Sequence, residues 1–173
     1  MDKREYEMCV FSNCDFSNAN LAQSIFIDCE FYNCNLSTVT VLETGFQNIL
    51  FKDCKILGVR FDKCSGFAFS IKIDNCQLNH SSFFKQKLSK MTFKKSKLHE
   101  VDFTDCDLRE SIFDECDLQN AIFYNTDLQK GDFRNSFNFT IDPENNKIKG
   151  AQFALETVVG LLKKYNIKIE PNF

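Results

Sequence analysis

The stretch FTDCDLRESIFDECDLQNAIFYNTDLQKGDF, residues 103–133, places a large apolar residue at every fifth position. Phenylalanine and leucine alternate at these positions, which are Phe103, Leu108, Phe113, Leu118, Phe123, Leu128 and Phe133. On an α-helix, five residues turn the chain by about 500°, so these side chains would not form one stripe. In a flat strand, a step of five alternates between the two faces. The stretch therefore predicts a chain that bends once in every five residues.

The same period extends over most of the chain. Eleven large residues follow it from Phe11 to Phe61, and thirteen follow it from Ile73 to Phe133. Two positions before each large residue lies a second, usually smaller one, such as Ser111. A period this regular indicates a solenoid. In a four-sided coil the phenylalanines and leucines would form separate columns, because their alternation repeats every ten residues.

Units such as CDFSN, ANLAQ, CDLRE, CDLQN and TDLQK resemble the A(D/N)LXX repeat of the pentapeptide repeat family, over residues 9–133. The resemblance implies a right-handed quadrilateral β-helix with four units per coil and two inward side chains per unit. Counting one irregular side, the units make about six coils. We therefore expect an all-β solenoid at residues 1–139. At 140–173 we expect an irregular last coil, a capping and dimerising α-helix, and a tail.

The period breaks at DKCSGFAFSIKI, residues 62–73. The two large residues that flank the break lie 12 residues apart, where two units would take ten. One side with two extra residues restores the register and places Ile73 beneath Phe51. Such a bulge bends the coil locally. Its aromatic residues Phe67 and Phe69 are also candidates for contact with a partner.

All nine cysteines occupy the small inward slot of the five-residue period, and in all but Cys64 a large residue follows two positions later. They are Cys9, Cys14, Cys29, Cys34, Cys54, Cys64, Cys76, Cys106 and Cys116. A metal site or a disulfide framework has no reason to follow this slot, whereas a small buried apolar side chain does. Stacked cysteines would lie about 5 Å apart, but their parallel side chains and a reducing cytoplasm disfavour disulfides. We therefore expect reduced packing residues, with no metal and no cofactor.

Residues 154–165, ALETVVGLLKKY, space apolar side chains as on one face of an α-helix. We expect this amphipathic helix to cap the open end of the solenoid. In the quinolone-resistance branch of the family, the corresponding helix and tail also form a homodimer, and the ending of this chain looks similar. The resemblance thus implies a tail-to-tail homodimer. The candidate residues for the cap and the dimer are Phe153, Leu155, Val158, Val159, Leu162, Ile167 and Ile169.

The outward residues carry two blocks of charge. Six lysines from Lys85 to Lys97 have no acid between them, and eight acids from Glu100 to Asp117 are offset only by Arg109. In a solenoid these blocks become a basic belt and an acidic belt, and charge runs of this kind usually form a solvated face. The aspartates that we consider as partner contacts are Asp102, Asp107, Asp117 and Asp127.

Quinolone-resistance pentapeptide repeat proteins resemble B-form DNA in size and surface charge, and they bind DNA gyrase or topoisomerase IV. The resemblance implies a type II topoisomerase as partner here, with quinolone protection as the effect. A DNA duplex is continuously negative, however, whereas this chain has a net charge of −3 and a lysine belt. A scaffold that binds another cytoplasmic protein is therefore the alternative.

Other function classes have less support. An acidic belt beside the lysine belt disfavours direct binding of a long nucleic acid. His80 and His99 lie at outward positions without an evident nucleophile or ligand cluster, and the chain has no P-loop or GxSxG motif, so we expect no enzyme. The chain has neither an apolar run of membrane-span length nor a signal-peptide pattern, so we expect a cytoplasmic protein that makes no membrane contact.

Overall fold

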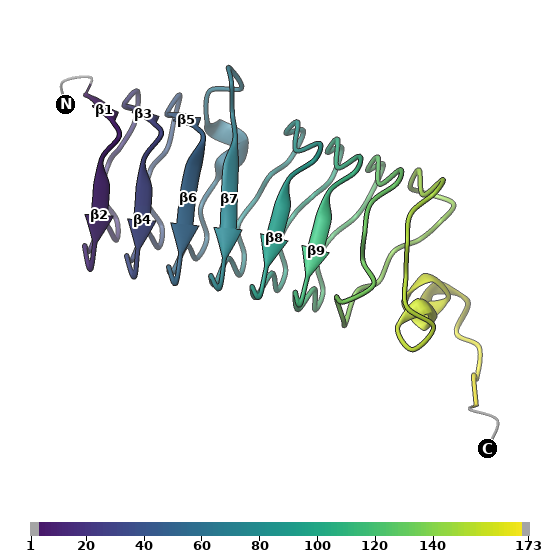
Figure 1. The fold of residues 1–173 in the computed structure, drawn as a ribbon. Coiled ribbons are helices and arrows are strands. Elements are labelled where there is room, and N and C mark those ends of the chain that lie inside the picture. The colour runs from purple at the N-terminus through teal and green to yellow at the C-terminus, as the bar shows by residue number, and fades with distance from the viewer. Residues whose placement is uncertain (1–3, 171–173) are drawn as a thin grey trace.

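The computed structural model describes residues 4–170. The chain winds into coils that stack side by side in chain order, so that its two ends lie at opposite ends of a rod (Figure 1). Residues 1–3 and 171–173, which belong to the predicted regions 1–139 and 140–173, lie outside the described residues. The molecule is a solenoid, as the five-residue period predicts.

Two of the four sides of the coils carry strands, and all of their pairs are parallel. Side 1 holds a sheet of β1 (Glu5–Glu7), β3 (Ile25–Ile27) and β5 (Gly45–Gln47). Side 2 holds a sheet of β2 (Val10–Ser12), β4 (Glu30–Tyr32), β6 (Ile49–Lys52), β7 (Ile71–Asp74), β8 (Thr92–Lys94) and β9 (Ile112–Asp114). Phe11 pairs with Phe31, and Phe31 with Phe51, so one coil takes four units. The all-β solenoid of about six coils is confirmed.

Sides 3 and 4 are joined by isolated parallel bridges. Side 3 includes the bridge of Asn35 to Lys55, and side 4 includes the bridge of Arg60 to Ser82. Side 1 continues beyond β5 through similar bridges, of which Asp107 to Asp127 is one. Successive coils are therefore hydrogen-bonded on all four sides, except on side 1 next to the insertion, although only two sides form extended strands.

The chain turns its corners with residues in the left-handed conformation. Nearly every unit ends with a residue of positive φ, two positions after its large residue, as at Asn13 (φ 55°) and Asn33 (φ 50°). Asparagine and aspartate tolerate this conformation better than most residues. In the later coils lysine and glutamate also adopt it, as at Lys90 (φ 63°) and Glu110 (φ 60°). This repeated conformation explains the bend in every five residues.

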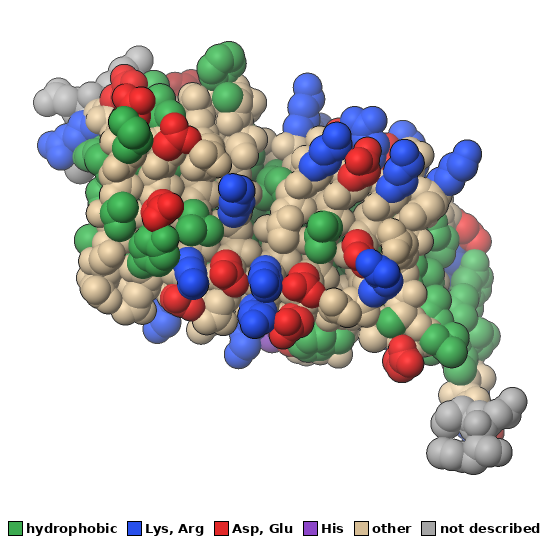
Figure 2. All heavy atoms as spheres, in the orientation of Figure 1, with side chains coloured by type: hydrophobic (Ala, Val, Ile, Leu, Met, Phe, Trp, Pro, Cys, Tyr) green, Lys and Arg blue, Asp and Glu red, His purple; other side chains and the backbone are tan. Residues whose placement is uncertain are grey.

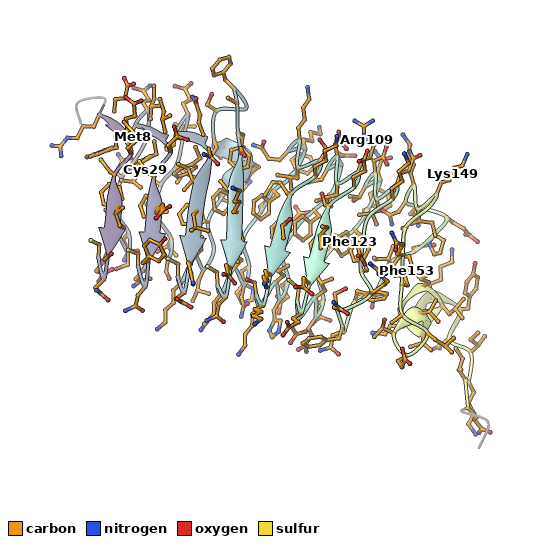
Figure 3. The ribbon with its side chains drawn as sticks, viewed as in Figure 1. Met8, Cys29, Arg109, Phe123, Lys149 and Phe153 are labelled. Atoms are coloured by element: carbon orange, nitrogen blue, oxygen red, sulfur yellow. The ribbon has the colours of Figure 1, made fainter. Side chains whose placement is uncertain are left out.

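The phenylalanines stack in columns inside the coils. Phe113 lies nearly parallel to Phe93 and Phe133, with ring centroids 4.9 and 4.8 Å away. It meets Phe103 and Phe123, which belong to the column on the opposite side, edge to face. Phe123 points into the coil in Figure 3. Offset stacks and edge contacts are the geometries that aromatic rings favour, and the predicted separation of phenylalanine and leucine columns is confirmed.

The nine cysteines line the smaller inward slot. Seven are buried, Cys9 and Cys14 near the N-terminal end are partly exposed, and none is in a disulfide. The thiol of Cys106 donates a hydrogen bond to the carbonyl of Phe83 at 2.9 Å, which ties one coil to the next. Burial raises the pKa of Cys106 and of Cys116 to about 12. Both thiols are therefore protonated and unreactive near neutral pH.

The two extra residues form a loop between sides 4 and 2. The loop follows the short 3-10 helix η1 (Phe61–Lys63) and projects beyond the neighbouring coils, just before β7 (Figure 1). After the loop, β7 pairs with β6, and Ile73 lies opposite Phe51. This is the register that the sequence predicts, so the insertion changes one corner and leaves the stack intact.

The C-terminal cap is helical, but it differs in type from the predicted amphipathic α-helix. It consists of two short 3-10 helices, η2 (Val158–Leu161) and η3 (Lys163–Tyr165). The carbonyl of Gly160 accepts a hydrogen bond from the N–H of Ile141 at 3.2 Å, so it is not used within an α-helix. A Cβ on Gly160 would lie only 2.5 Å from the carbonyl oxygen of Phe139. Within residues 4–170, no helix is long and apolar enough to cross a membrane.

Candidate protein-binding surfaces

The four aspartates predicted to contact a partner also hold the turns of the coil. In each of them, a carboxylate oxygen accepts a hydrogen bond from the backbone N–H two residues later. The donors are Thr104, Arg109, Gln119 and Gln129, at 2.9, 3.2, 3.3 and 3.2 Å. Such Asx turns explain why aspartate or asparagine precedes the large residue in many units. The four side chains are half-buried, so only part of each faces a partner.

These aspartates lie on three different sides of the rod. Asp107 and Asp127 are bridged neighbours on side 1, whereas Asp102 lies on side 4 and Asp117 on side 3. The structure thus brings only Asp107 and Asp127 together. The four residues do not form one acidic patch, and their role as partner contacts stays a prediction.

Arg109 neutralises part of the acidic belt. Arg109 donates two hydrogen bonds to the carboxylate of Asp107, from Nε at 2.8 Å and from Nη2 at 2.6 Å. These bonds hold the pKa of Asp107 below its usual value, against the opposing effect of partial burial. Beyond the belt, Arg134 donates two hydrogen bonds to the carboxylate of Asp132 in the same way, at 3.0 and 2.7 Å. The belt is therefore less negative than its aspartates alone suggest.

The basic and acidic belts face each other across one coil. Each of the six lysines has an acid 20 residues later, which is one full coil away. The pairs are Lys85–Asp105, Lys87–Asp107, Lys90–Glu110, Lys94–Asp114, Lys95–Glu115 and Lys97–Asp117. Two of them are ion pairs, Lys90–Glu110 at 4.0 Å and Lys95–Glu115 at 3.9 Å. Figure 2 accordingly shows lysine and acidic side chains intermixed over these coils. The belts offset one another and do not form a continuous acidic face.

The two aromatic residues of the insertion behave differently. Phe67 is 77% exposed. Phe69 is half-buried, and its ring packs edge-on against Phe61 at 6.2 Å. Of this predicted pair, Phe67 is the side chain that is fully available to a partner.

Each of the two histidines lies beside a carboxylate. Nε2 of His99 lies 2.7 Å from Oδ2 of Asp117. Partial burial would raise the pKa of Asp117, but hydrogen bonds from Asn138 and His99 outweigh it and keep that pKa low. Nδ1 of His80 lies 3.2 Å from Glu100 at the exposed surface. In the part of the chain that the structure describes, neither histidine is hydrogen-bonded to a hydroxyl or thiol. No group of three His, Cys, Asp or Glu among those residues could hold a metal ion.

Five of the cap and dimer candidates form an exposed apolar surface at the end of the rod. They line a hollow of about 650 Å³ and are Leu155, Val159, Leu162, Ile167 and Ile169. Leu155 is 84% exposed and Ile167 is 57% exposed. Apolar side chains gathered at this exposure are typical of a surface that another protein covers.

The other two candidates belong to the cap itself. Phe153 stacks on Phe133 at 5.4 Å and closes the phenylalanine column, and Figure 3 shows it at the last coil. Val158 is half-buried in η2. Lys164 fastens the cap to the last coil through an ion pair with Asp142 at 2.7 Å. The predicted set thus divides into residues that close the core and residues that face outward.

Two features of the surface were not predicted from the sequence. The first is the pairing of the belts, which the 20-residue spacing of lysines and acids could have revealed. The second is a hollow between the coils of β7 and β8, lined by Phe69, Met91 and several lysines. We call it the lysine-rimmed hollow. The insertion and the lysine run next to it were both visible in the sequence, but only the structure shows that they meet.

Comparisons with known proteins agree with this geometry. A model of the pentapeptide repeat region matches residues 5–83 and 69–153. The chain belongs to the pentapeptide repeat family. Two trypsin-treated forms of QnrB1, a plasmid-mediated fluoroquinolone resistance protein, superpose on this pentapeptide repeat protein with TM-scores of 0.69 and 0.70, at 18% and 19% identity. The alignments cover 96% and 98% of this chain and 92% and 94% of QnrB1. No curated protein sequence matches the chain.

Proposed function

We propose that this pentapeptide repeat protein is a non-catalytic, cytoplasmic binding protein whose partner is a type II topoisomerase, DNA gyrase or topoisomerase IV. The observation that carries the proposal is the likeness of fold to QnrB1 along nearly the whole chain. QnrB1 is a fluoroquinolone resistance protein. We expect the same effect here, which is protection of the topoisomerase from quinolones.

The surface supports recognition by shape and by particular side chains rather than by continuous negative charge. The lysine and acidic belts offset each other between adjacent coils, whereas a DNA duplex is negative along its whole length. The projecting Phe67 and the neighbours Asp107 and Asp127 all lie on side 1 or its corner, so one partner surface could meet them together. We therefore place the proposed contact along this side of the rod.

A supercoiling assay with purified gyrase tests the proposal. The protein is titrated with and without ciprofloxacin, and the same series is run as a decatenation assay with topoisomerase IV. We expect micromolar protein to restore activity in the presence of the drug, or to inhibit the enzyme in its absence. No effect on either enzyme at tens of micromolar protein would reject topoisomerase binding.

A matched pair of variants locates the contact. Phe67→Ser removes an aromatic side chain that is 77% exposed, and it should weaken the effect by about tenfold. Met8→Ser removes a side chain that is 72% exposed near the N-terminal end, and it should leave the titration unchanged. Equal behaviour of the two variants would place the contact elsewhere on the rod.

The apolar end of the rod supports a homodimer in the same proposal. Burying Leu155, Ile167 and Ile169 against a second copy would remove these side chains from water, and each would contribute on the order of 1–2 kcal/mol. Light scattering at tens of micromolar should give the mass of two chains. Leu155→Asp should give one chain, and the control Leu42→Asp, on side 4, should stay dimeric. A wild-type monomer would reject the dimer.

A scaffold for another protein is the second candidate, favoured by an exposed apolar pair on side 4. Ile122 is 49% exposed and Tyr124 is 58% exposed, and both point outward from one unit. If topoisomerases do not respond, cross-linking in the native host should recover a partner with the wild-type protein. The double variant Ile122→Ser/Tyr124→Ser should lose it, and Ile112→Ser should keep it.

A further inference from the structure

The lysine-rimmed hollow lies at the corner between sides 1 and 2, where the coils of β7 and β8 meet. Its volume is about 480 Å³, which is within the usual range for binding sites. Figure 2 shows the surface set back between these coils, with hydrophobic atoms at the back of the recess. The insertion therefore creates a concave site in an otherwise regular wall.

The hollow exists because the insertion interrupts hydrogen bonding on side 1. The sheet of that side ends at β5, and its bridges resume only at Lys87. No backbone hydrogen bond joins residues 66–70 to 86–90 within the described chain. Side 2 stays paired through β7 and β8 at the same level. The two coils are thus joined on one side of the corner and open on the other.

The inner part of the hollow is apolar. Phe69 and Leu50 are half-buried, and Met91 is 8% exposed. Leu50 lies on β6 directly opposite Lys72 on β7. These side chains come from three successive coils, so an apolar group of a ligand would touch all three.

The rim of the hollow is basic. Lys72, Lys87, Lys90 and Lys94 line it and are exposed, and Asp74 is the acid among the lining residues. Lys90 pairs with Glu110 at 4.0 Å. Lys72, Lys87 and Lys94 have no ion-pair partner within 4 Å in the described chain, although acids of the next coil lie beyond two of them. The rim therefore offers unpaired positive charge above an apolar floor.

We propose that the lysine-rimmed hollow binds a short acidic peptide segment of a partner protein. One bulky apolar side chain of the segment enters the hollow, and its carboxylates meet the lysines of the rim. The charge complementarity is local, because the next coil presents Asp107, Glu110 and Asp114 at the same positions. A long polyanion along the rod would meet those acids, whereas a short segment would not. The proposal does not depend on a topoisomerase partner.

Fluorescence anisotropy with the full chain tests the proposal. The probe is a short fluorescein-labelled peptide in which one phenylalanine is flanked by glutamates on both sides. We expect saturable binding with a dissociation constant of about 10–100 µM at low salt. Replacing the phenylalanine of the peptide by serine should weaken binding by about tenfold, because the apolar floor then stays empty. A single-stranded oligonucleotide of the same charge should bind more weakly than the phenylalanine peptide.

Matched variants of the protein assign the binding to the hollow. Lys72→Glu/Lys87→Glu should weaken it by at least about tenfold, and Lys130→Glu/Lys149→Glu, with the same change in net charge, should not. Leu50→Ser should weaken it by about threefold, and Leu42→Ser on side 4 should not. Absence of binding would overturn the proposal. The proposal would also be overturned if the serine peptide or the oligonucleotide bound as tightly as the phenylalanine peptide. The same holds if the two double lysine variants lost equal affinity. Each of these results would indicate unspecific attraction to lysines.

Discussion

The coils that carry β8 and β9 and the coil that carries β7 bury the same kinds of side chain, but their outer surfaces differ. In the regular coils, outward residues one coil apart are neighbours, and Lys90 thereby pairs with Glu110. Lys72, on β7, lies opposite Leu50 and makes no ion pair within the described residues. The period thus arranges the surface charges as well as the core, and next to the insertion Lys72 has an apolar residue opposite it instead of an acid. The proposed peptide site therefore lies where the period fails.

We expect the largest effect on stability from removing a phenylalanine ring, and we compare one such ring from each of the two regions. Phe113 is fully buried among four other rings, so Phe113→Ala should cost about 3–5 kcal/mol of unfolding free energy. Phe69, beside the insertion, is half-buried and has one ring contact, so Phe69→Ala should cost about 1–2 kcal/mol. Urea unfolding followed by circular dichroism measures both.

The comparison between the two variants is the test. Equal losses would mean that the insertion coil is packed as tightly as the regular coils, and the hollow would then not exist as described. A loss below about 0.5 kcal/mol for Phe113→Ala would contradict the inward column itself. Phe67→Ala serves as the control, because its ring is 77% exposed and its removal should change stability very little.

The core of this fold was predictable because the inward residues obey a simple rule. Phe93, Phe113 and Phe133 are one coil apart in the sequence and stack in the structure. The type of the C-terminal helix was not predictable, because it depends on the contact of Gly160 with the last coil, which no local pattern reports. The spacing of apolar residues at 154–165 still identified a helical cap.

The surface was less predictable than the core. Lys90 and Glu110 were assigned to separate belts, although their spacing of one coil already placed them side by side. The Asx-turn role of residues such as Asp117 needed the backbone conformation, since the same residue type also occurs in binding sites. The lysine-rimmed hollow depends on a gap in backbone pairing on side 1 between residues 66–70 and 86–90, which the sequence cannot report.

Lowering the pH should change the stability less than the removal of the Phe113 ring does. The pKa of Asp117 in a regular coil lies below its usual value, since the hydrogen bonds from Asn138 and His99 outweigh the effect of burial. Its stabilising contribution is therefore present above the unfolded pKa of about 3.9 and is lost as the pH falls through the lower folded value. At pH 7, Asp117→Asn should cost about 1 kcal/mol, a modest value because the carboxylate is partly exposed.

An acid titration measures the contribution of Asp117 to stability. The difference in unfolding free energy between wild type and Asp117→Asn should vanish as the pH falls below about 4. Urea unfolding at several pH values measures this difference. As a control, the side chain of Asp74, on β7, has no hydrogen-bond or ion-pair partner in residues 4–170, so Asp74→Asn should leave stability at pH 7 nearly unchanged. If this difference stayed constant from neutral to acid pH, the role assigned to the hydrogen bonds of Asp117 would be contradicted.

We expect the smallest effect on stability from reversing the surface charges that distinguish the two regions. Lys90→Glu would bring two acids together across adjacent coils and should cost about 0.5 kcal/mol, because the pair with Glu110 is exposed. The double variant Lys90→Glu/Glu110→Lys should restore stability, and 1 M salt should reduce the difference, because exposed charges are screened. Lys72→Glu should have no such cost, since Lys72 has Leu50 rather than an acid opposite it. If Lys72→Glu cost as much as Lys90→Glu, the lysines at the insertion would already be paired, and no free charge would remain there for a partner.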